Sequence, residues 1–417
     1  MSTATVRAGF IPLLDCATLV VAHEHGFARA EGIALDLIRE TSWSNVRDRV
    51  AVGHFDVAHM LAPIPIAAAL GLLPLSPPML APMALGLGGN AVTVAPGLWR
   101  RMSDAGADAS GEPARAVAAL KRVVEARRCR GEPPLTFAVV FPFSAHNYKL
   151  RYWLASGGIH PDRDVRLTVV PPPFMVDALR EGVIDGFCVG EPWSSLAAHA
   201  GIGVIATTSA AIWRLSPEKV LGMRASWAER HPELVSGLVR ALHRASLWCD
   251  EPANRKELAR LLAGPDYLGQ PAEILARGLA GCLPTGGGEG VPNDGFLVFA
   301  RSAATFPWAS HALWFYTQMV RWEHVPRSPA ALQTARRAYR PDLYRAALVA
   351  SDLPLPSVDG KVEGALAAPT DAGTATGRLT LGPDGFFDGL AFDPDRVDAY
   401  IDGFAIRADT ARYGAEN

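Results

Sequence analysis

Four polar side chains of this sequence stand where a short apolar run meets a helix start or a turn, and each could donate a hydrogen bond. Lys219 opens an apolar run, His146 lies in the turn after another, and Trp43 begins a helical pattern. Asn90 follows two glycines. Together they offer a positive charge and several N–H donors. A buried oxyanion needs both, because an uncompensated buried charge is very costly and charge-assisted hydrogen bonds offset that cost.

Each of these residues also has an ordinary structural explanation. An edge lysine, a histidine in a turn and a core tryptophan are all common. Residues 88–90 would also serve as a plain turn, although Gly89 lets the backbone approach an anion closely and donate an N–H. Glu191 and Asp185 lie at strand ends, but a fully ionised oxyanion has no proton with which to donate a hydrogen bond to a carboxylate. We expect these two carboxylates to orient neighbouring donors.

The elements that position these residues alternate between strand and helix, which predicts an α/β fold with a largely parallel sheet. Ligands of such sheets bind at the carboxyl ends of the strands. A chain of 417 residues is too long for one simple core, so two lobes are expected. In the first series, strands are predicted at 6–11, 33–38 and 55–59, and helices at 17–28, at 44–52 and after Pro63.

A second series follows residues 96–114, whose Pro, Gly, Ser and Asp content predicts a surface loop. A helix-ending glycine followed shortly by aspartate recurs 129 positions later (182 − 53), a weak sign of two similar lobes because such helix ends are common. Another strand is predicted at 219–223, followed by long amphipathic helices. The rest of the second series has predicted helices at 116–126, 147–155 and 176–181, and strands at 136–140, 165–170, 184–189 and 204–206.

Composition narrows the class of protein. A formal net charge of −2 and a pI near 6.6 argue against direct nucleic-acid binding. The five cysteines are odd in number and isolated, which favours reduced thiols over a disulfide framework. The N-terminus shows no secretory pattern and no apolar run reaches the roughly 20 residues of a membrane span, so a cytoplasmic location without membrane association is expected. No metal, cofactor or enzyme fingerprint is expected either.

Several longer motifs resemble one known family: the substrate-binding proteins of nitrate and bicarbonate ABC transporters, together with their soluble nitrate/nitrite sensor relative of the NasS type. The resemblance extends from about residue 5 to 322. The matching segments are 9–22 (GFIPLLDCATLVVA), 42–48 (SWSNVRD), 58–65 (AHMLAPIP), 141–155 (FPFSAHNYKLRYWLA), 184–193 (IDGFCVGEPW), 217–222 (PEKVLG) and 306–315 (FPWASHALWF).

The resemblance implies a periplasmic-binding-protein fold of type II, with two lobes, two crossovers and a ligand cleft between the lobes. Lobe one would combine residues 1–93 with 217–340, lobe two would span 94–216, and residues 341–417 would form an extension packed on lobe one. It also implies that Trp43, Gly89, Asn90, His146 and Lys219 bind nitrate or nitrite. Lys219 favours these ions because the bicarbonate binders of the family lack a lysine there.

Two functions follow from the resemblance. The first is that of a cytoplasmic sensor, which binds nitrate or nitrite and thereby controls release of an ANTAR-type antiterminator. The alternative is the substrate-binding protein of a nitrate/nitrite ABC transporter. An enzyme is not expected: a thiamine-pyrimidine synthase shares the fold, but its relatives carry a cysteine-rich run, whereas Cys188 stands alone here.

Overall fold

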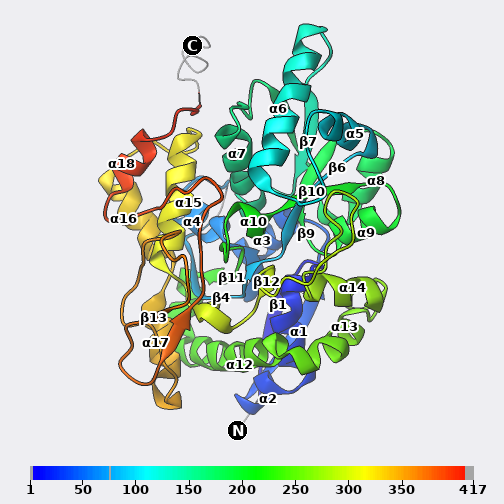
Figure 1. The fold of residues 1–417 in the computed structure, drawn as a ribbon. Coiled ribbons are helices and arrows are strands. Elements are labelled where there is room, and N and C mark those ends of the chain that lie inside the picture. The colour runs from blue at the N-terminus through cyan, green and yellow to red at the C-terminus, as the bar shows by residue number, and fades with distance from the viewer. Residues whose placement is uncertain (1–2, 75–76, 409–417) are drawn as a thin grey trace.

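A computed structural model describes residues 3–74 and 77–408, and its strands form two separate five-stranded sheets. The first sheet has the strand order β2-β1-β3-β11-β4; its strands β1, β4 and β11 are labelled in the lower half of Figure 1. Strands β1, β2 and β3 run parallel, whereas β11 is antiparallel to β3 and β4. The strands are β1 (Ala4–Phe10), β2 (Ile33–Arg39), β3 (Val57–Leu61), β4 (Met79–Ala84) and β11 (Lys219–Arg224).

The second sheet has the order β10-β6-β9-β7-β8. Strand β6 is antiparallel to both neighbours, and β7 is parallel to β8 and β9. Central strands such as β3 and β9 are buried at every residue, as expected when helices cover both faces of a sheet. The strands are β6 (Asn90–Val94), β7 (Leu135–Val139), β8 (Val165–Val169), β9 (Gly186–Gly190) and β10 (Val204–Thr208).

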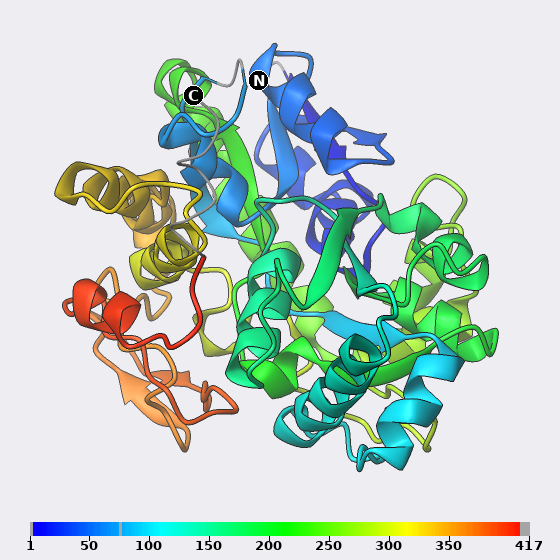
Figure 2. The same ribbon diagram turned by 90° about the horizontal axis from the view of Figure 1, so that it is seen from above.

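These two sheets with flanking helices confirm the predicted two-lobed periplasmic-binding-protein fold (Figure 2). The strand predicted at 219–223 is confirmed by β11. The chain enters the second sheet earlier than the division at residue 93 assumed, since all of β6 pairs with β9 and β10. It returns to the first sheet after the short helix α10 (Ser209–Ile212).

The loop predicted at 96–114 is largely helical. Helix α5 (Pro96–Asp104) and helix α6 (Pro113–Cys129) each begin at a proline, which is favoured at the first helical position. The Glu112 side chain caps α6 by accepting the N–H groups of Ala114 and Arg115. Proline and glycine here mark helix boundaries, so the prediction of one continuous loop was wrong.

The region after residue 340 packs on helix α15 (Ala309–Arg321) through α18 (Val397–Asp402), and it also reaches α7 (Ala145–Ser156) of the second lobe. The Tyr152 hydroxyl on α7 donates to Asp388 at 2.8 Å. The Phe386 ring stacks on Trp213, beside the return crossover, at a centroid distance of 4.5 Å. The extension therefore contacts both lobes, and its residues 409–417 lie outside the described part of the chain.

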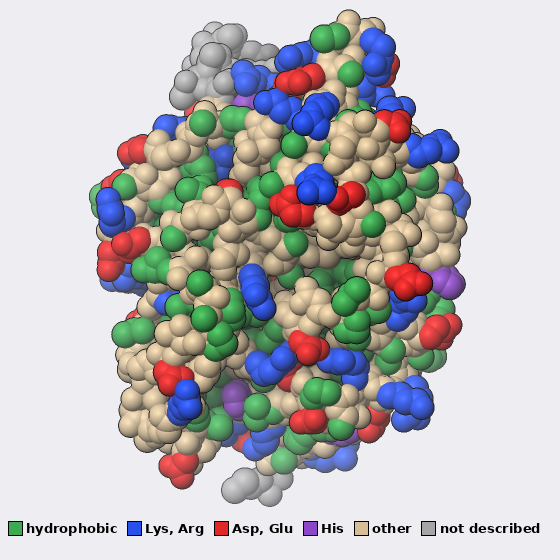
Figure 3. Space-filling view, in the orientation of Figure 1, with side chains coloured by type: hydrophobic (Ala, Val, Ile, Leu, Met, Phe, Trp, Pro, Cys, Tyr) green, Lys and Arg blue, Asp and Glu red, His purple; other side chains and the backbone are tan. Residues whose placement is uncertain are grey.

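The surface gives no sign of one dominant charge. On the face seen in Figure 3, basic and acidic side chains are interspersed. Within residues 3–74 and 77–408, no helix combines the length and apolar character needed to cross a bilayer. By contrast, several charged side chains are buried in the interior, among them Asp15, Lys149, Glu218 and Lys219.

Candidate functional site

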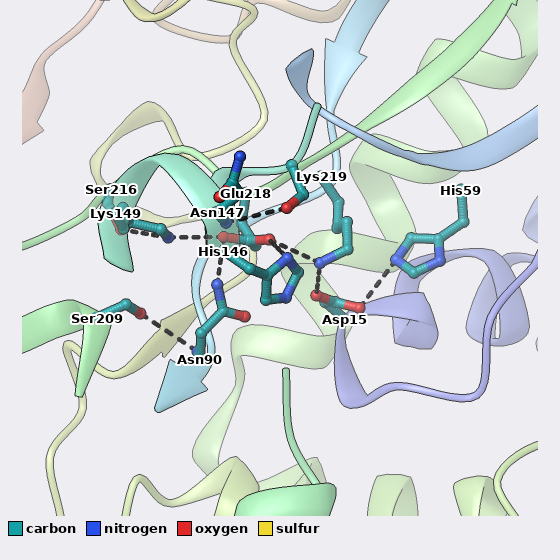
Figure 4. A network of polar contacts seen from close by, with 11 residues as sticks. Asp15, His59, Asn90, His146, Asn147, Lys149, Ser209, Ser216, Glu218 and Lys219 are labelled. Atoms are coloured by element: carbon teal, nitrogen blue, oxygen red, sulfur yellow. Dashed lines mark hydrogen bonds and ion pairs between the residues drawn. The ribbon is translucent and has the colours of Figure 1, made fainter. Parts of the chain in front are cut away.

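The predicted side-chain donors lie at the beginnings of four elements that come together at one buried place; Figure 4 shows three of them, Asn90, His146 and Lys219. Asn90 opens β6, and Lys219 opens β11. Trp43 opens α3 (Trp43–Ala51), and His146 lies in the first turn of α7. Serines cap both helices: Ser42 accepts an N–H at 3.2 Å and Ser144 one at 3.0 Å. Two positive helix ends therefore face the same buried place.

Lys219 is 1% exposed and contacts other residues that the first lobe contributes to the site. Its ammonium donates to Asp15 Oδ2 at 2.8 Å and to Glu218 Oε1 at 2.9 Å. It also lies 5.4 Å from the centre of the Trp43 ring, within cation–π range. An ammonium has three N–H donors, so one remains for a ligand after these two bonds.

Glu218 links the two lobes, because its carboxylate accepts from both. Lys149, on α7 of the second lobe, donates to Glu218 Oε2 at 2.6 Å and to Ser216 at 3.1 Å. The Asn90 amide nitrogen donates to the same Oε2 atom. Glu218 and Lys149 are each 1% exposed, so this bridge is sealed from solvent.

Neighbouring lysines, together with the polar rings of His146 and His59, hold both carboxylates of the site ionised. Burial would raise the pKa of Glu218, but His146, Lys149 and Lys219 outweigh it and lower that pKa to about 2. Burial is likewise overcome at Asp15, where Lys219 and His59 hold the pKa well below its usual value. Burial opposes the charge of Lys219, yet the two carboxylates keep its pKa above normal.

The histidines of the site are neutral. Burial lowers the pKa of His146 to about 3, although Glu218 opposes this shift. Burial also lowers the pKa of His59, against the pull of Asp15. Since a carboxylate only accepts, neutral His59 donates its Nε2–H to Asp15 at 2.9 Å.

Several buried polar atoms at this place have no hydrogen-bond partner. They include both ring nitrogens of His146, Nδ1 of His59, the indole nitrogen of Trp43 and the amide oxygen of Asn90. Buried polar atoms are nearly always satisfied in proteins, so a cluster of unsatisfied ones indicates a place for a small polar ligand or water. Three of the four residues come from the predicted set.

Two sequence expectations need correction here. The N–H of Gly89 donates to the carbonyl of Phe296 at 2.7 Å, so in this conformation it is not free for an anion. Asp185 and Glu191 do not orient the lysines or histidines: Asp185 accepts the N–H of Thr136 at 2.8 Å, and Glu191 accepts that of Ser195 at 3.3 Å. They secure a strand and a helix start, outside the donor cluster.

Sequence reasoning also missed Asp15, His59, Lys149 and Glu218. Lys149 follows His146 by three positions on a helix, which places both on one face, and this spacing was a usable signal. Glu218 is the direct neighbour of Lys219. No local pattern marks Asp15 or His59. In the described ranges, no group of three or more His, Cys, Asp or Glu side chains is arranged to hold a metal ion.

Comparison with known proteins places this chain in a family. The family model described as NMT1-like matches residues 1–263. The chain belongs to the NMT1-like family. Its relatives include the nitrate/nitrite binding protein NrtA of Synechococcus elongatus, with 31% identity over 97% of this chain and 86% of that protein. The family resemblance predicted from the sequence is confirmed at this level, among substrate-binding proteins of nitrate and bicarbonate transporters.

Other relatives are longer or more distant. The nitrate import ATP-binding protein NrtC of Synechocystis is 35% identical over 96% of this chain, which spans only 55% of that protein. The crystal structure of the periplasmic nitrate-binding protein NrtA from Synechocystis superposes with a TM-score of 0.84 at 29% identity, covering 97% of this chain and 99% of that one. The alkanesulfonate-binding protein SsuA of Xanthomonas axonopodis shares only the fold, with a TM-score of 0.56 at 17% identity over 81% of this chain and 99% of that one.

Proposed function

We propose that this protein binds nitrate or nitrite between its lobes and serves as the substrate-binding component of an ABC transporter. The observation that carries this proposal is the sealed donor cluster, in which the Lys219 ammonium faces unsatisfied groups of Trp43 and His146. The relatives named for nitrate and nitrite binding support the choice of ion. They also support the transporter role, the alternative in the sequence analysis, over the sensor role.

The chemistry of the cluster suits a small planar oxyanion. The free N–H of Lys219 and the indole N–H of Trp43 can only donate, and nitrate and nitrite can only accept. The donors are so deeply buried that the lobes must separate before an ion enters. An ion that bridges donors from both lobes would favour the closed arrangement, as in other two-lobed binding proteins.

Isothermal titration tests this proposal directly. The full chain is titrated with nitrate, nitrite, bicarbonate and an alkanesulfonate in the same buffer. We expect saturable binding of nitrate or nitrite and much weaker binding of the other two. Absence of binding by both nitrogen oxyanions would overturn the proposal, and preference for bicarbonate would overturn the choice of ion.

The cytoplasmic sensor remains a second candidate because of the cysteines. All five are free thiols, with three buried and Cys129 exposed, which suits a reducing compartment. In this proposal an ANTAR-type antiterminator binds the open form and leaves when the anion closes the lobes. A pull-down with such a protein, with and without nitrate, tests it: retention that nitrate does not change would contradict the sensor role.

A further inference from the structure

The anion site is electrically balanced before any ion arrives. The carboxylates of Asp15 and Glu218 cancel the ammonium groups of Lys149 and Lys219. All four side chains are at least 95% buried. Adding a monoanion would therefore leave one uncompensated negative charge in a sealed interior, which is strongly unfavourable. A compensating positive charge is therefore expected to enter the site together with the anion.

Building on the proposed anion binding, we propose that the site takes up one proton from solvent with each anion, and that the His146–Glu218 pair holds this proton. His146 Nδ1 lies 3.4 Å from Glu218 Oε1, and both ring nitrogens lack hydrogen-bond partners. A protonated imidazole has two N–H donors, one for Glu218 and one for the anion. The complex then holds three positive and three negative charges.

The carboxylate of Glu218 accepts from the donors that an incoming ion would use. A carboxylate is itself a planar oxyanion, and this one already accepts from Lys149, Lys219 and Asn90 (Figure 4). An incoming anion competes with it for the same donors. Without the anion, burial keeps His146 neutral, with its pKa lowered to about 3. A negative ion next to the ring reverses this preference, so protonation and anion binding favour each other.

The other titratable groups that face this pair do not account for the proton. His59 is hydrogen-bonded to Asp15, which Lys219 separates from Glu218, so a proton on its ring would not pair with the carboxylate that competes with the anion. Burial raises the pKa of the Cys188 thiol to about 12 and that of Tyr339 well above its usual value, so both stay neutral and protonated. The remaining charged groups facing the pair are Asp15, Lys149 and Lys219.

Calorimetry measures the proton directly. Nitrate, which stays a monoanion, is titrated into the full chain between pH 6 and pH 8, in two buffers with different ionisation enthalpies. We expect uptake of about one proton per nitrate, and an affinity that falls roughly tenfold per pH unit as the pH rises. Nitrate binding without proton uptake would overturn this inference and leave the proposed function standing.

The variant Glu218→Gln locates the proton. Because the amide removes one negative charge, we expect nitrate to bind without proton uptake, with little pH dependence and at least tenfold tighter than the wild type at pH 8. Glu191→Gln is the control, since burial raises the pKa of Glu191 to about 7 and it lies outside the cluster. The Glu191→Gln variant should still take up one proton per nitrate bound. Uptake that persists in Glu218→Gln would overturn the assignment, and no nitrate binding by either protein would overturn the proposed function as well.

Discussion

The described part of the chain contains two clusters in which lysines pair with buried carboxylates, and the clusters differ in how completely their polar atoms are satisfied. The anion site joins Lys149 and Lys219 to Asp15 and Glu218. The C-terminal extension has Lys361 paired with Glu363 and Asp384. In each cluster a histidine ring lies 3.4 Å from a glutamate: His146 from Glu218, and His311 from Glu363.

In the cluster of the extension, as in the other one, every oxygen of the two carboxylates accepts from a donor of the chain itself. Glu363 accepts from Ser310 at 2.5 Å and from Lys361, and Asp384 accepts from Lys361 and from the Leu366 N–H at 2.9 Å. The anion site, however, leaves the ring nitrogens of His146 without partners. Burial and charge alone therefore do not mark a binding site. Unsatisfied polar atoms among the charges do, because a structural cluster has no use for them.

Lys361→Met should produce the largest effect, on stability. It leaves two buried carboxylates without their cation, which costs about 3–5 kcal/mol of unfolding free energy. Because the pKa of Glu363 is lowered to about 2 from its usual 4.5, the stability it provides is present above pH 4.5 and lost as the pH falls toward 2. Urea unfolding at pH 7 measures the loss. Nitrate affinity should stay within about twofold, and a large change in affinity would contradict the separation of the two clusters.

Lys219→Met should reverse this pattern, with its main effect on binding. The variant removes the ammonium that faces the ligand and leaves the site with a net negative charge. We expect nitrate affinity to fall at least about 100-fold, equivalent to roughly 2.7 kcal/mol. Titration calorimetry on a variant shown to be folded by circular dichroism measures it. Affinity equal to that of the wild type would place Lys219 outside the binding site.

Glu191→Gln should have the smallest effect, and it should raise the free energy of unfolding instead of lowering it. Burial raises the pKa of Glu191 to about 7, and its Oε1 has no hydrogen-bond partner. The ionised group therefore costs stability above pH 7, a cost that disappears as the pH falls toward 4.5. The pKa shift corresponds to about 3 kcal/mol at full ionisation, and the cost of burying the new amide offsets part of it. The variant should therefore be more stable than the wild type by about 1–2 kcal/mol at pH 8, and no more stable than it near pH 4.5. An equal gain at both pH values would show that ionisation is not the cause.

Much of the site was predictable because its residues begin elements. Trp43, His146 and Lys219 each stand at a boundary that the hydrophobic pattern reveals, and the α/β fold brings such boundaries together. Their convergence needed no knowledge of distant contacts. The α/β class followed from the same alternation of strands and helices, whereas the two lobes were expected from the chain length and the family resemblance.

The rest depends on contacts between distant parts of the chain. Gly89 was expected to keep a free N–H, but the strand pair formed with residues near Phe296 uses it. Asp15 belongs to the site only because β3 brings His59, and β11 brings Lys219, to the same place. Neither pairing leaves a local pattern. The charge balance of the site, which depends on Asp15, could therefore not be predicted.

The extension has a mechanical consequence for ion exchange. Helix α7 carries His146 and Lys149 near one end, and near its other end Tyr152 and Ser156 both donate to Asp388 of the extension. The second lobe is thus attached at a third point beyond the two crossovers. A third attachment restricts the directions in which the two lobes can rotate relative to each other. In the proposed opening, the lobes would pivot near α7, and the gap that admits the ion would widen on the opposite side.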